Sequence, residues 1–444
     1  MGEEMTHTAT GTGDRPETAV VERARKLIGG SGAVLAELGE AAVERFESLG
    51  FPGRKDEMFT FVNTREIVSA ILEGEPAEPA EISEEFVRSM IYAGLEKSVV
   101  VMVNGFYSER LSDLSALGGA ARVRKLEKIG AGSETQKYLL DDAAKETDPF
   151  ASLNGVFSMD GVVIEIDEGA ALPAPLQILC VNEGDGGKRP IAAPRMVVEA
   201  GEGSRAQVIM KQTGRGAYIA DSSAHILAGR NSEISLVHVQ ADPSGALNLS
   251  KTRVTQRGGS SLRAILAFSG GQTARGVFEA RLAEEGASLE LDGVSILKGR
   301  EQAHHYARVF HDAPGCSSRQ LFRNIVADGA RVSVDGTVIV GRGARLTDSN
   351  QLINNLMLSD DAVVDIKPNL MIYADDVKCS HGATVGQVDE DQLFYLRTRG
   401  FTEAAAKALL IRSFARTVMD RIEHEPVAED AAAILLGKLE AENA

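Results

Sequence analysis

The spacing of apolar and polar positions is most regular in the middle of the chain, from about residue 152 to residue 386. Short stretches rich in β-branched residues alternate there with turns that contain Gly or Asn, about one turn every 12 to 16 residues. Several turns lead into related phrases, namely GSRAQV, NSEISL, GSSLRA, GASLEL, GARVSV and GARLTD. Regular short strands occur in sandwiches, barrels and solenoids. Repetition over about 150 residues favours a β-solenoid, with a sandwich as the alternative.

The region before the repeats predicts helices and one strand. Apolar residues recur at near-helical spacing over Pro16 to Gly29, Val34 to Leu49 and Ile82 to Ala93. The stretch SVVVMVNGF, Ser98 to Phe106, is rich in β-branched residues and ends in the turn signal Asn104-Gly105. It therefore predicts a strand that is followed by a tight turn.

The region after residue 386 predicts three helices. Asp389 stands three residues before Gln392, which is typical of a capping pair at a helix start, and Gly400 ends this first helix. Thr402 can cap the second helix, which we expect to end at Pro426. The apolar stripe of the second helix is Ala406, Leu410, Phe414 and Val418, and that of the last helix, over 428–439, is Ala432, Leu435, Leu436 and Leu439. Helices at this place either cap the solenoid or offer a groove to a partner.

The composition narrows the classes of function. The chain of 444 residues has a formal net charge of −17, which argues against a nucleic-acid partner because phosphate binding needs a cationic face, although it leaves a local basic patch open. Its densest apolar run, Val99 to Val103, is far shorter than the roughly 18–20 residues that cross a bilayer, so we expect no membrane span. The three cysteines, Cys180, Cys316 and Cys379, are too few for a disulfide framework and indicate free thiols in a reducing cytoplasm.

Two glycine-rich phrases match nucleotide-binding motifs without the required context. GEGSRA, Gly201 to Ala206, fits G-x-G-x-x-A, but a dinucleotide fingerprint opens a helix and the following QVIMKQ predicts a strand. GRGARL, 341–346, fails in the same way, so both are predicted to be turns. No G-x-x-x-x-G-K-[ST] motif occurs, and we expect no P-loop ATP site in this chain.

The segment HHYARVFHDAPGC collects potential metal ligands at His304, His305, His311 and Cys316. On a strand, His305 and His311 point to the same side. Six residues of strand separate them by about 20 Å, which is too far for one ion, and catalytic zinc needs a third placed ligand. The segment is therefore predicted to supply polar sheet residues and a turn.

The segment DDVKCSHGAT places a thiol and an imidazole two residues apart. On a strand, Cys379 and His381 face the same side, with Asp375 and Val377 in the same row. The pair can be structural, or it can supply two ligands to iron or zinc, which is half of a tetrahedral site. It can also act as a Cys nucleophile with a His base, oriented by Asp375 or Asp376. The residues alone leave these three readings open.

A longer stretch around this pair closely resembles a known family. Residues 350–400, NQLINNLMLSDDAVVDIKPNLMIYADDVKCSHGATVGQVDEDQLFYLRTRG, resemble the SufD subunits of the SUF iron–sulfur cluster assembly system, in the SufB/SufD family. The stretch HDAPGCSSRQLFRNIVADGARVSVDGTVIV resembles the preceding part of the same domain. The phrase DDVKCSHGAT is similar to SufD rather than to SufB, whose corresponding segment lacks this Cys-Ser-His. GRKDEMFTF, 53–61, is similar to the family's arginine-and-acid stretch, with Met58 at a usually aromatic position.

The resemblance implies a mainly β fold, in which a right-handed parallel β-helix (solenoid) is flanked by N-terminal and C-terminal α-helical domains. The expected units are a mobile tail (1–15), an N-terminal helical domain (16–97), a β-helix core domain (98–386) and a C-terminal helical domain (387–444). Within the core domain, a strand-rich first part (98–151) is expected to precede the regular coils (152–386).

The resemblance also implies a non-enzymatic scaffold subunit. Such a subunit pairs with SufB through the β-helix ends, and the C-terminal helices bind the ABC-type ATPase SufC in a SufBC2D complex. His381 is then the candidate iron ligand at the SufB interface, and Cys379 is a neighbouring thiol. The candidate SufC-docking residues are Leu393, Phe394, Leu396, Leu410, Phe414 and Val418.

The same resemblance sets the expectations for cofactors and for the isolated chain. No tightly bound cofactor is expected in the isolated chain, whereas a transient iron ion or iron–sulfur cluster is expected at the complex interface and a flavin only in the complex. Without its partners, the chain is expected to be able to form a homodimer through the same strands. The alternative function is a metal- or thiol-dependent hydrolase on a β-solenoid that uses Cys379 and His381.

Overall fold

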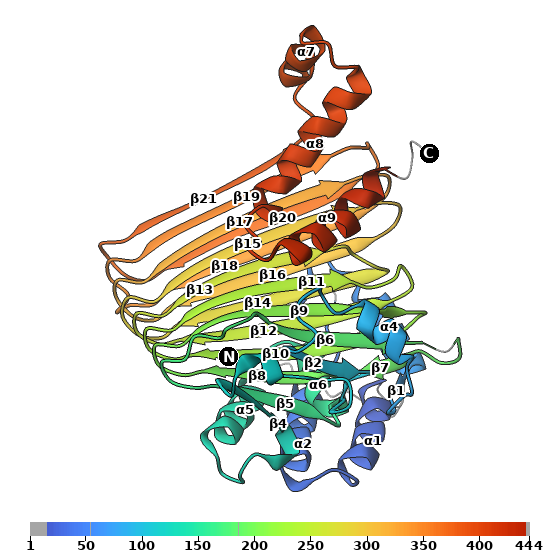
Figure 1. The fold of residues 1–444 in the computed structure, drawn as a ribbon, viewed down its shortest axis with the longest axis vertical. Coiled ribbons are helices and arrows are strands. Elements are labelled where there is room, and N and C mark those ends of the chain that lie inside the picture. Colours follow the sequence, from blue (N-terminus) through green and yellow to red (C-terminus); the bar gives the residue numbers. More distant parts are fainter. Residues whose placement is uncertain (1–15, 54, 185, 441–444) are drawn as a thin grey trace, which may run out of the picture.

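A two-sheet parallel β-solenoid forms the centre of the computed structural model, which describes residues 16–53, 55–184 and 186–440 (Figure 1). Consecutive coil strands alternate between the sheets, and each pairs in parallel with the strand one coil away. The first sheet contains β4 (Ala121–Lys125), β5 (Gly161–Ile166), β8 (Arg195–Ala200), β10 (Ile219–Ala228), β12 (Leu247–Gln256), β14 (Thr273–Leu282), β16 (Gln302–His311), β18 (Arg331–Val340) and β20 (Val363–Ile372), with β1 (Glu75–Pro76) and β7 (Pro190–Ala192) at its side. The second contains β3 (Phe106–Tyr107), β2 (Val99–Val103), β6 (Leu176–Glu183), β9 (Arg205–Arg215), β11 (Glu233–Ala241), β13 (Ser261–Phe268), β15 (Ser288–Leu297), β17 (Ser317–Val326), β19 (Asp348–Met357) and β21 (Lys378–Gly386). The solenoid prediction is confirmed.

The strand register explains the even spacing of the turns. Ile219 pairs with Leu247 and Glu233 pairs with Ser261, so one coil takes about 28 residues and holds two strands and two turns. Gly259, at φ 66°, occupies a turn in the left-handed conformation that glycine adopts without steric cost. The expected turn spacing therefore corresponds to half a coil.

The solenoid has an apolar interior because alternate residues of each strand point inward. Leu262, Leu289 and Val338 belong to one buried cluster that runs through the coils. The same alternation places the intervening residues on the outer faces, which the helices then cover.

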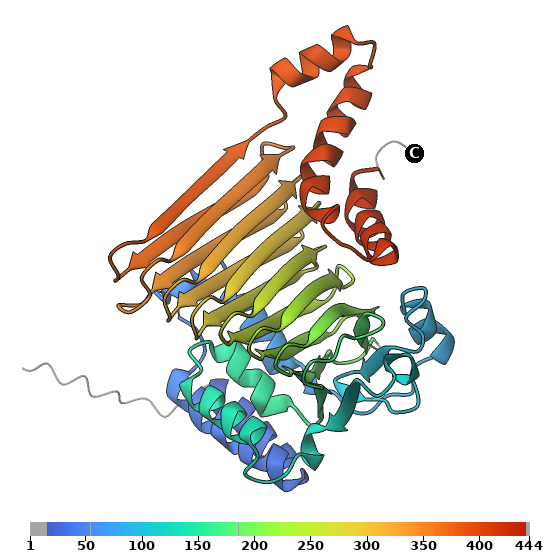
Figure 2. The ribbon, with the colours of Figure 1, turned by 60° about the vertical axis from the view of Figure 1, so that its left-hand side comes forward.

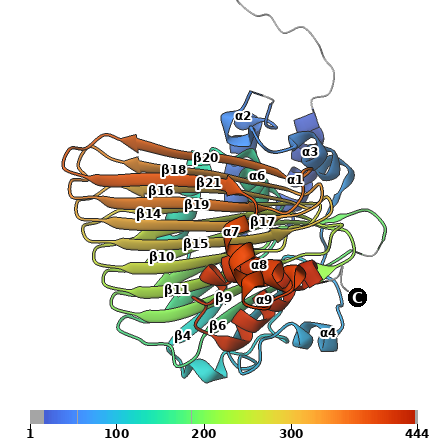
Figure 3. The ribbon, with the colours of Figure 1, turned by 90° about the horizontal axis from the view of Figure 1, so that it is seen from above.

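The N-terminal helices cover the outer face of the first sheet over its early coils (Figures 1 and 3). They are α1 (Pro16–Ile28), α2 (Ala33–Leu49), α3 (Thr64–Glu73), α5 (Glu134–Lys145) and α6 (Pro149–Phe157), while α4 (Glu84–Ser89) lies to the side, and short 3₁₀ turns occupy Glu57–Phe59, Ser115–Leu117 and Leu126–Lys128. The segment predicted as strand-rich, 98–151, thus also contains α5 and the start of α6. These short helices are stabilised by packing on α2 and the sheet, which a local pattern does not reveal. The predicted tail, 1–15, lies outside the described residues.

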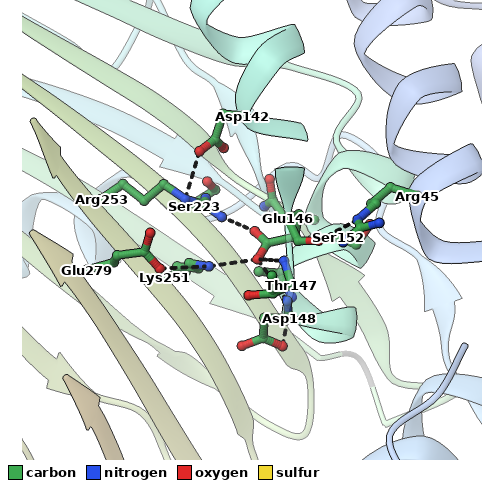
Figure 4. Close-up of polar contacts among 12 residues, drawn as sticks. Arg45, Asp142, Glu146, Thr147, Asp148, Ser152, Ser223, Lys251, Arg253 and Glu279 are labelled. Atoms are coloured by element: carbon green, nitrogen blue, oxygen red, sulfur yellow. Dashed lines mark hydrogen bonds and ion pairs between the residues drawn. The ribbon is translucent and has the colours of Figure 1, made fainter. Parts of the chain in front are cut away.

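Buried ion pairs fasten the α5–α6 connection to the first sheet (Figure 4). The Glu146 side chain, 4% exposed, accepts from Lys251 Nζ at 2.7 Å and from Arg253, whose side chains are 5% and 9% exposed. Arg253 Nε also contacts Asp142 Oδ1 at 2.9 Å. The charges on β12 are therefore compensated by nearby carboxylates, chiefly those of the helical layer, rather than by solvent.

The C-terminal helices are α7 (Glu390–Thr398), α8 (Glu403–Met419) and α9 (Glu425–Glu440). The predicted caps are present, because Asp389 accepts from the backbone N–H of Gln392 and Thr402 accepts from that of Ala405. The prediction that Pro426 ends the second helix is wrong. That helix ends at Met419, and Pro426 lies in the first turn of α9, where a proline's missing N–H costs no helical hydrogen bond.

The C-terminal half of α8 and all of α9 pack on the outer face of the second sheet (Figures 2 and 3). Ile411 and Val418 share a buried cluster with Ile265 and Ile325. Ion pairs add to this contact, among them Arg421 Nη1 with Asp292 Oδ2 at 2.8 Å. In contrast, α7 and the start of α8 project beyond the last coil (Figure 2). None of the described helices is long and apolar enough to span a membrane.

Candidate functional site

The two ends of the solenoid differ in what covers them. The first coils end in the antiparallel strands β3 and β4 and in the helical layer. At the other end, β20 and β21 are edge strands, and every residue of both is exposed or half-buried. The exposed apolar side chains at this end include Val363, Met371, Ile372, Tyr373 and Val385. Long, unpaired edge strands with apolar side chains are typical of surfaces that pair with another chain.

Cys379 and His381 lie on β21 at this open end. They pair in register with Ser349 and Gln351 of β19, whose side chains are buried inside the solenoid. Because aligned side chains of a parallel sheet stack on the same face, both residues face the solenoid's interior at its open mouth. Cys379 is half-buried and packs against the interior cluster, whereas His381 is exposed. The prediction that the two share one side of a strand is confirmed.

The surroundings of Cys379 favour the neutral thiol. Burial raises the pKa of this thiol, and the nearby Asp348 carboxylate raises it further. A nucleophilic cysteine needs the opposite shift, toward a thiolate at neutral pH. Coordination by a metal removes the proton of such a thiol directly. The shift of the Cys379 pKa thus argues against a nucleophilic thiolate in the isolated chain.

The predicted place of Asp375 is wrong. Asp375 and Asp376 lie in the turn between β20 and β21 rather than on the strand that carries Cys379. Asp376 adopts φ 57°, a left-handed conformation that interrupts the strand pattern. Neither carboxylate thus shares the strand row of His381.

The histidines of β16 are hydrogen-bonded sheet residues, as predicted, and His305 and His311 point into the solenoid. His305 Nε2 lies 2.8 Å from Ser295 Oγ, and His311 Nε2 lies 2.8 Å from Ser318 Oγ. Burial lowers the pKa of each imidazole to about 4, so both are neutral near pH 7. His304 points to the other side of the strand and contacts Ser333 at 2.7 Å, and Cys316 lies in a turn, where its Sγ contacts a backbone carbonyl.

The described part of the chain contains no group of three or more His, Cys, Asp or Glu side chains that could hold a metal ion. Cys379 and His381 therefore lack a third such ligand among the described residues. Burial raises the pKa of Cys180 to about 12, and this thiol lies inside the early coils, far along the chain from the open end.

Sequence reasoning missed the side chains directly beneath the pair. Ser349 lies under Cys379, and Gln351 lies under His381, each about 30 residues earlier in the chain. The sequence signal that could have found them is the length of one coil, because Cys379 and His381 lie one coil after Ser349 and Gln351. That length varies between coils, so the partners can be assigned only from the register.

The predicted docking residues divide into exposed and buried ones. Phe394 is 67% exposed on α7, and Tyr395 beside it is 55% exposed. Leu396, Leu410 and Phe414 are half-buried. Leu393 and Val418 are buried within the chain, Val418 against the second sheet, so neither presents its side chain to a partner in this structure. The accessible apolar side chains are instead those from α7 to the first half of α8, which we call the projecting tip, namely Phe394, Tyr395, Phe401 and Leu409.

Two family models match the chain in succession. The SufBD protein N-terminal region matches residues 19–178, and the SufBD core domain of SUF system FeS cluster assembly matches residues 181–414, more than half of the chain. The chain belongs to the SufBD family. The resemblance to the SufB/SufD family is thereby confirmed, and so is the link to iron–sulfur cluster assembly by the SUF system.

Individual proteins that are similar to this chain match along most of their length. An iron–sulfur cluster assembly SufBD family protein of Synechocystis is 28% identical over 92% of this chain and 92% of its own length. The iron–sulfur cluster assembly protein SufD of Escherichia coli is 27% identical over 86% of this chain and 88% of its own. The chloroplastic protein ABCI7 of Arabidopsis thaliana is 28% identical over 89% and 84%.

Proposed function

We propose that this SufBD protein is a SufD-type, non-enzymatic scaffold subunit for iron–sulfur cluster assembly in the cytoplasm. The observation that carries the proposal is the open end of the solenoid, where two edge strands are uncovered and one of them, β21, carries Cys379 and His381. The phrase DDVKCSHGAT, which resembles SufD, lies at this end. The partners are a SufB-like subunit and a SufC-like ABC ATPase in a SufBC2D-type complex.

The open end is the proposed surface for the SufB-like subunit. Each edge strand offers an unpaired row of backbone N–H and C=O groups, and the side chains of Ile372, Tyr373 and Val385 are between 41% and 53% exposed. Another solenoid end can continue both sheets by strand addition and bury these side chains. In the isolated chain, a second copy can use the same strands to form a homodimer.

The metal chemistry follows from the two side chains at the mouth. A thiolate and a neutral imidazole are ligands for iron, but two ligands do not complete a coordination sphere. The partner subunit is proposed to supply the others, so that iron or a cluster is held as cargo between the subunits. The isolated chain is then expected to hold no tightly bound cofactor, and any flavin belongs to the complex.

The projecting tip is the proposed docking surface for the ATPase. Phe394 and Tyr395 are exposed on α7, which follows β21 after a connection of only three residues, 387–389. The chain itself has no P-loop motif, so ATP hydrolysis must come from the partner. Because α7 is joined so closely to β21, a force on the tip acts on the strand that carries Cys379 and His381.

The test is cluster assembly in the reconstituted complex with His381→Ala and Cys379→Ser variants. Ser380→Ala is the matched control, because Ser380 lies between the two on the same strand, where it contacts Asn350 on the outer side. The expected result is a large loss of cluster yield for His381→Ala and none for the control. An unchanged yield in a complex that assembles normally would remove His381 from the mechanism.

A further inference from the structure

Two columns of stacked side chains inside the solenoid, those beneath His381 and Cys379, change from apolar to polar toward the open end. In the column beneath His381, the stacked residues from the middle coils outward are Ala264, Leu291, Gln320 and Gln351. In the column beneath Cys379 they are Leu262, Leu289, Ser318 and Ser349. Only the last coils, next to the pair, thus place hydrogen-bonding side chains in these two columns.

Of the two polar atoms of the Gln351 amide, one makes a hydrogen bond and the other does not. Its Nε2 donates to Gln320 Oε1 at 3.2 Å, which sets the orientation of the amide. Its Oε1 is buried and has no hydrogen-bond partner among the described residues. The side chain is 0% exposed, and it fits because Gly336 lies opposite, where a Cβ would come within 2.1 Å of Nε2. The fold therefore makes room for this amide and leaves one acceptor unpaired.

His381 is the side chain that stacks next on this column. Neighbouring strands of a sheet lie about 4.8 Å apart, so a ring N–H of His381 can reach Gln351 Oε1 by side-chain rotation alone. An unpaired buried carbonyl oxygen costs free energy, so this hydrogen bond is favourable. We propose that Gln351 is a positioning residue for His381: Gln351 Oε1 accepts a hydrogen bond from one ring N–H and turns the other ring nitrogen toward the open end.

This arrangement has a chemical consequence for metal binding. An imidazole binds a metal through the lone pair of one nitrogen, and a hydrogen bond from the other nitrogen fixes which one is free. The inference rests on the proposed function for the role of His381 as a ligand. In the neighbouring column, beneath Cys379, Ser349 Oγ lies 3.0 Å from Ser318 Oγ, which in turn lies 2.8 Å from His311 Nε2.

The primary test measures the tautomer of His381 in the full-length chain without metal. Two-bond ¹⁵N–¹H correlation spectra of ¹⁵N-histidine-labelled protein at about pH 8.5 separate protonated from unprotonated ring nitrogens, since free imidazoles are neutral there. The signals of His381 are assigned by their loss in His381→Ala. We expect one protonated and one unprotonated nitrogen in the natural chain, and shifts that move toward averaged values in Gln351→Met. Averaged nitrogens in the natural chain would overturn the proposal, whether or not the variant folds.

A matched variant separates positioning from general damage. Gln256 is also a fully buried glutamine, and its Nε2 donates to the Ser288 carbonyl, in coils remote from His381. Gln256→Met should lower stability without moving the His381 nitrogens. An equal change of tautomer in both variants would contradict the specific role of Gln351.

A second readout links the tautomer to metal affinity. In the complex with the SufB-like subunit, Gln351→Met should weaken Co²⁺ binding by about 10- to 100-fold, as expected for loss of a hydrogen bond to a ligating histidine. Equal Co²⁺ affinity with a changed tautomer would show that His381 is not a ligand and would count against the proposed function alone. An unchanged tautomer would refute the role of Gln351 while leaving the scaffold function in place.

Discussion

Neutralising Glu146 should loosen the helical layer from the solenoid. In Glu146→Gln, the amide oxygen can still accept from the backbone N–H groups of Thr147 and Asp148, which lie 2.8 and 2.9 Å from the carboxylate oxygen. The charge that compensates Lys251 and Arg253 is lost, however, and both cations stay buried. The change therefore isolates the electrostatic contribution.

The expected loss of stability depends on the carboxylate partner that each cation keeps. Lys251 keeps Glu279 at 3.7 Å, and Arg253 keeps Asp142 at 2.9 Å, so neither is left wholly uncompensated. Losing one partner of a buried pair costs about 3–5 kcal/mol. Because second carboxylates remain, we expect the lower end, about 3 kcal/mol.

The assay is equilibrium urea unfolding together with hydrogen exchange measured by mass spectrometry. Exchange should accelerate first in α5 and α6, which Glu146 connects to β12. Asp141→Asn is the control, because it removes the same charge from α5 in an exposed pair with Lys145 and should change stability by less than about 0.5 kcal/mol. If the two variants lose equal stability, the reasoning from burial is refuted.

Three further predictions address the tip, the interior and the pH dependence. Phe394→Ser should weaken binding of the ATPase at least about tenfold, as measured by calorimetry. The melting temperature should not change, because Phe394 is 67% exposed, and a drop would show instead that its side chain packs within the chain. Gly336→Ala should cost about 1–3 kcal/mol in urea unfolding, because its Cβ would collide with Gln351, whereas Gly386→Ala has open space and should be tolerated. Burial lowers the pKa of His305 to about 4, so as pH falls the unfolded chain protonates this imidazole before the folded chain does. The free energy of unfolding should therefore fall as pH drops from about 6.5 toward 4, by at most about 3 kcal/mol from this group. His305→Asn should remove that share of the slope in urea midpoints measured across this range, and an unchanged slope would contradict it.

The amino-acid sequence alone determined the repeat of short strands and turns and the helices after it, and it favoured a solenoid over a sandwich. Turn chemistry and the alternation of inward and outward residues are local properties, so they are visible without the fold. The caps at Asp389 and Thr402 belong to the same class, because each involves neighbours three residues apart. The same-side placement of Cys379 and His381 also follows from strand periodicity alone.

Tertiary structure decided which residues lie beside Cys379 and His381 and which surfaces remain exposed to solvent. The residue beneath His381 depends on the length of one whole coil, and coil lengths differ with their turns. The burial of Val418 depends on the sheet against which α8 packs, and the strand pattern around Asp375 was interrupted by one left-handed turn residue, Asp376. Contacts between residues far apart in the chain set these features, because free energy is gained only when the coils stack and bury their faces against one another.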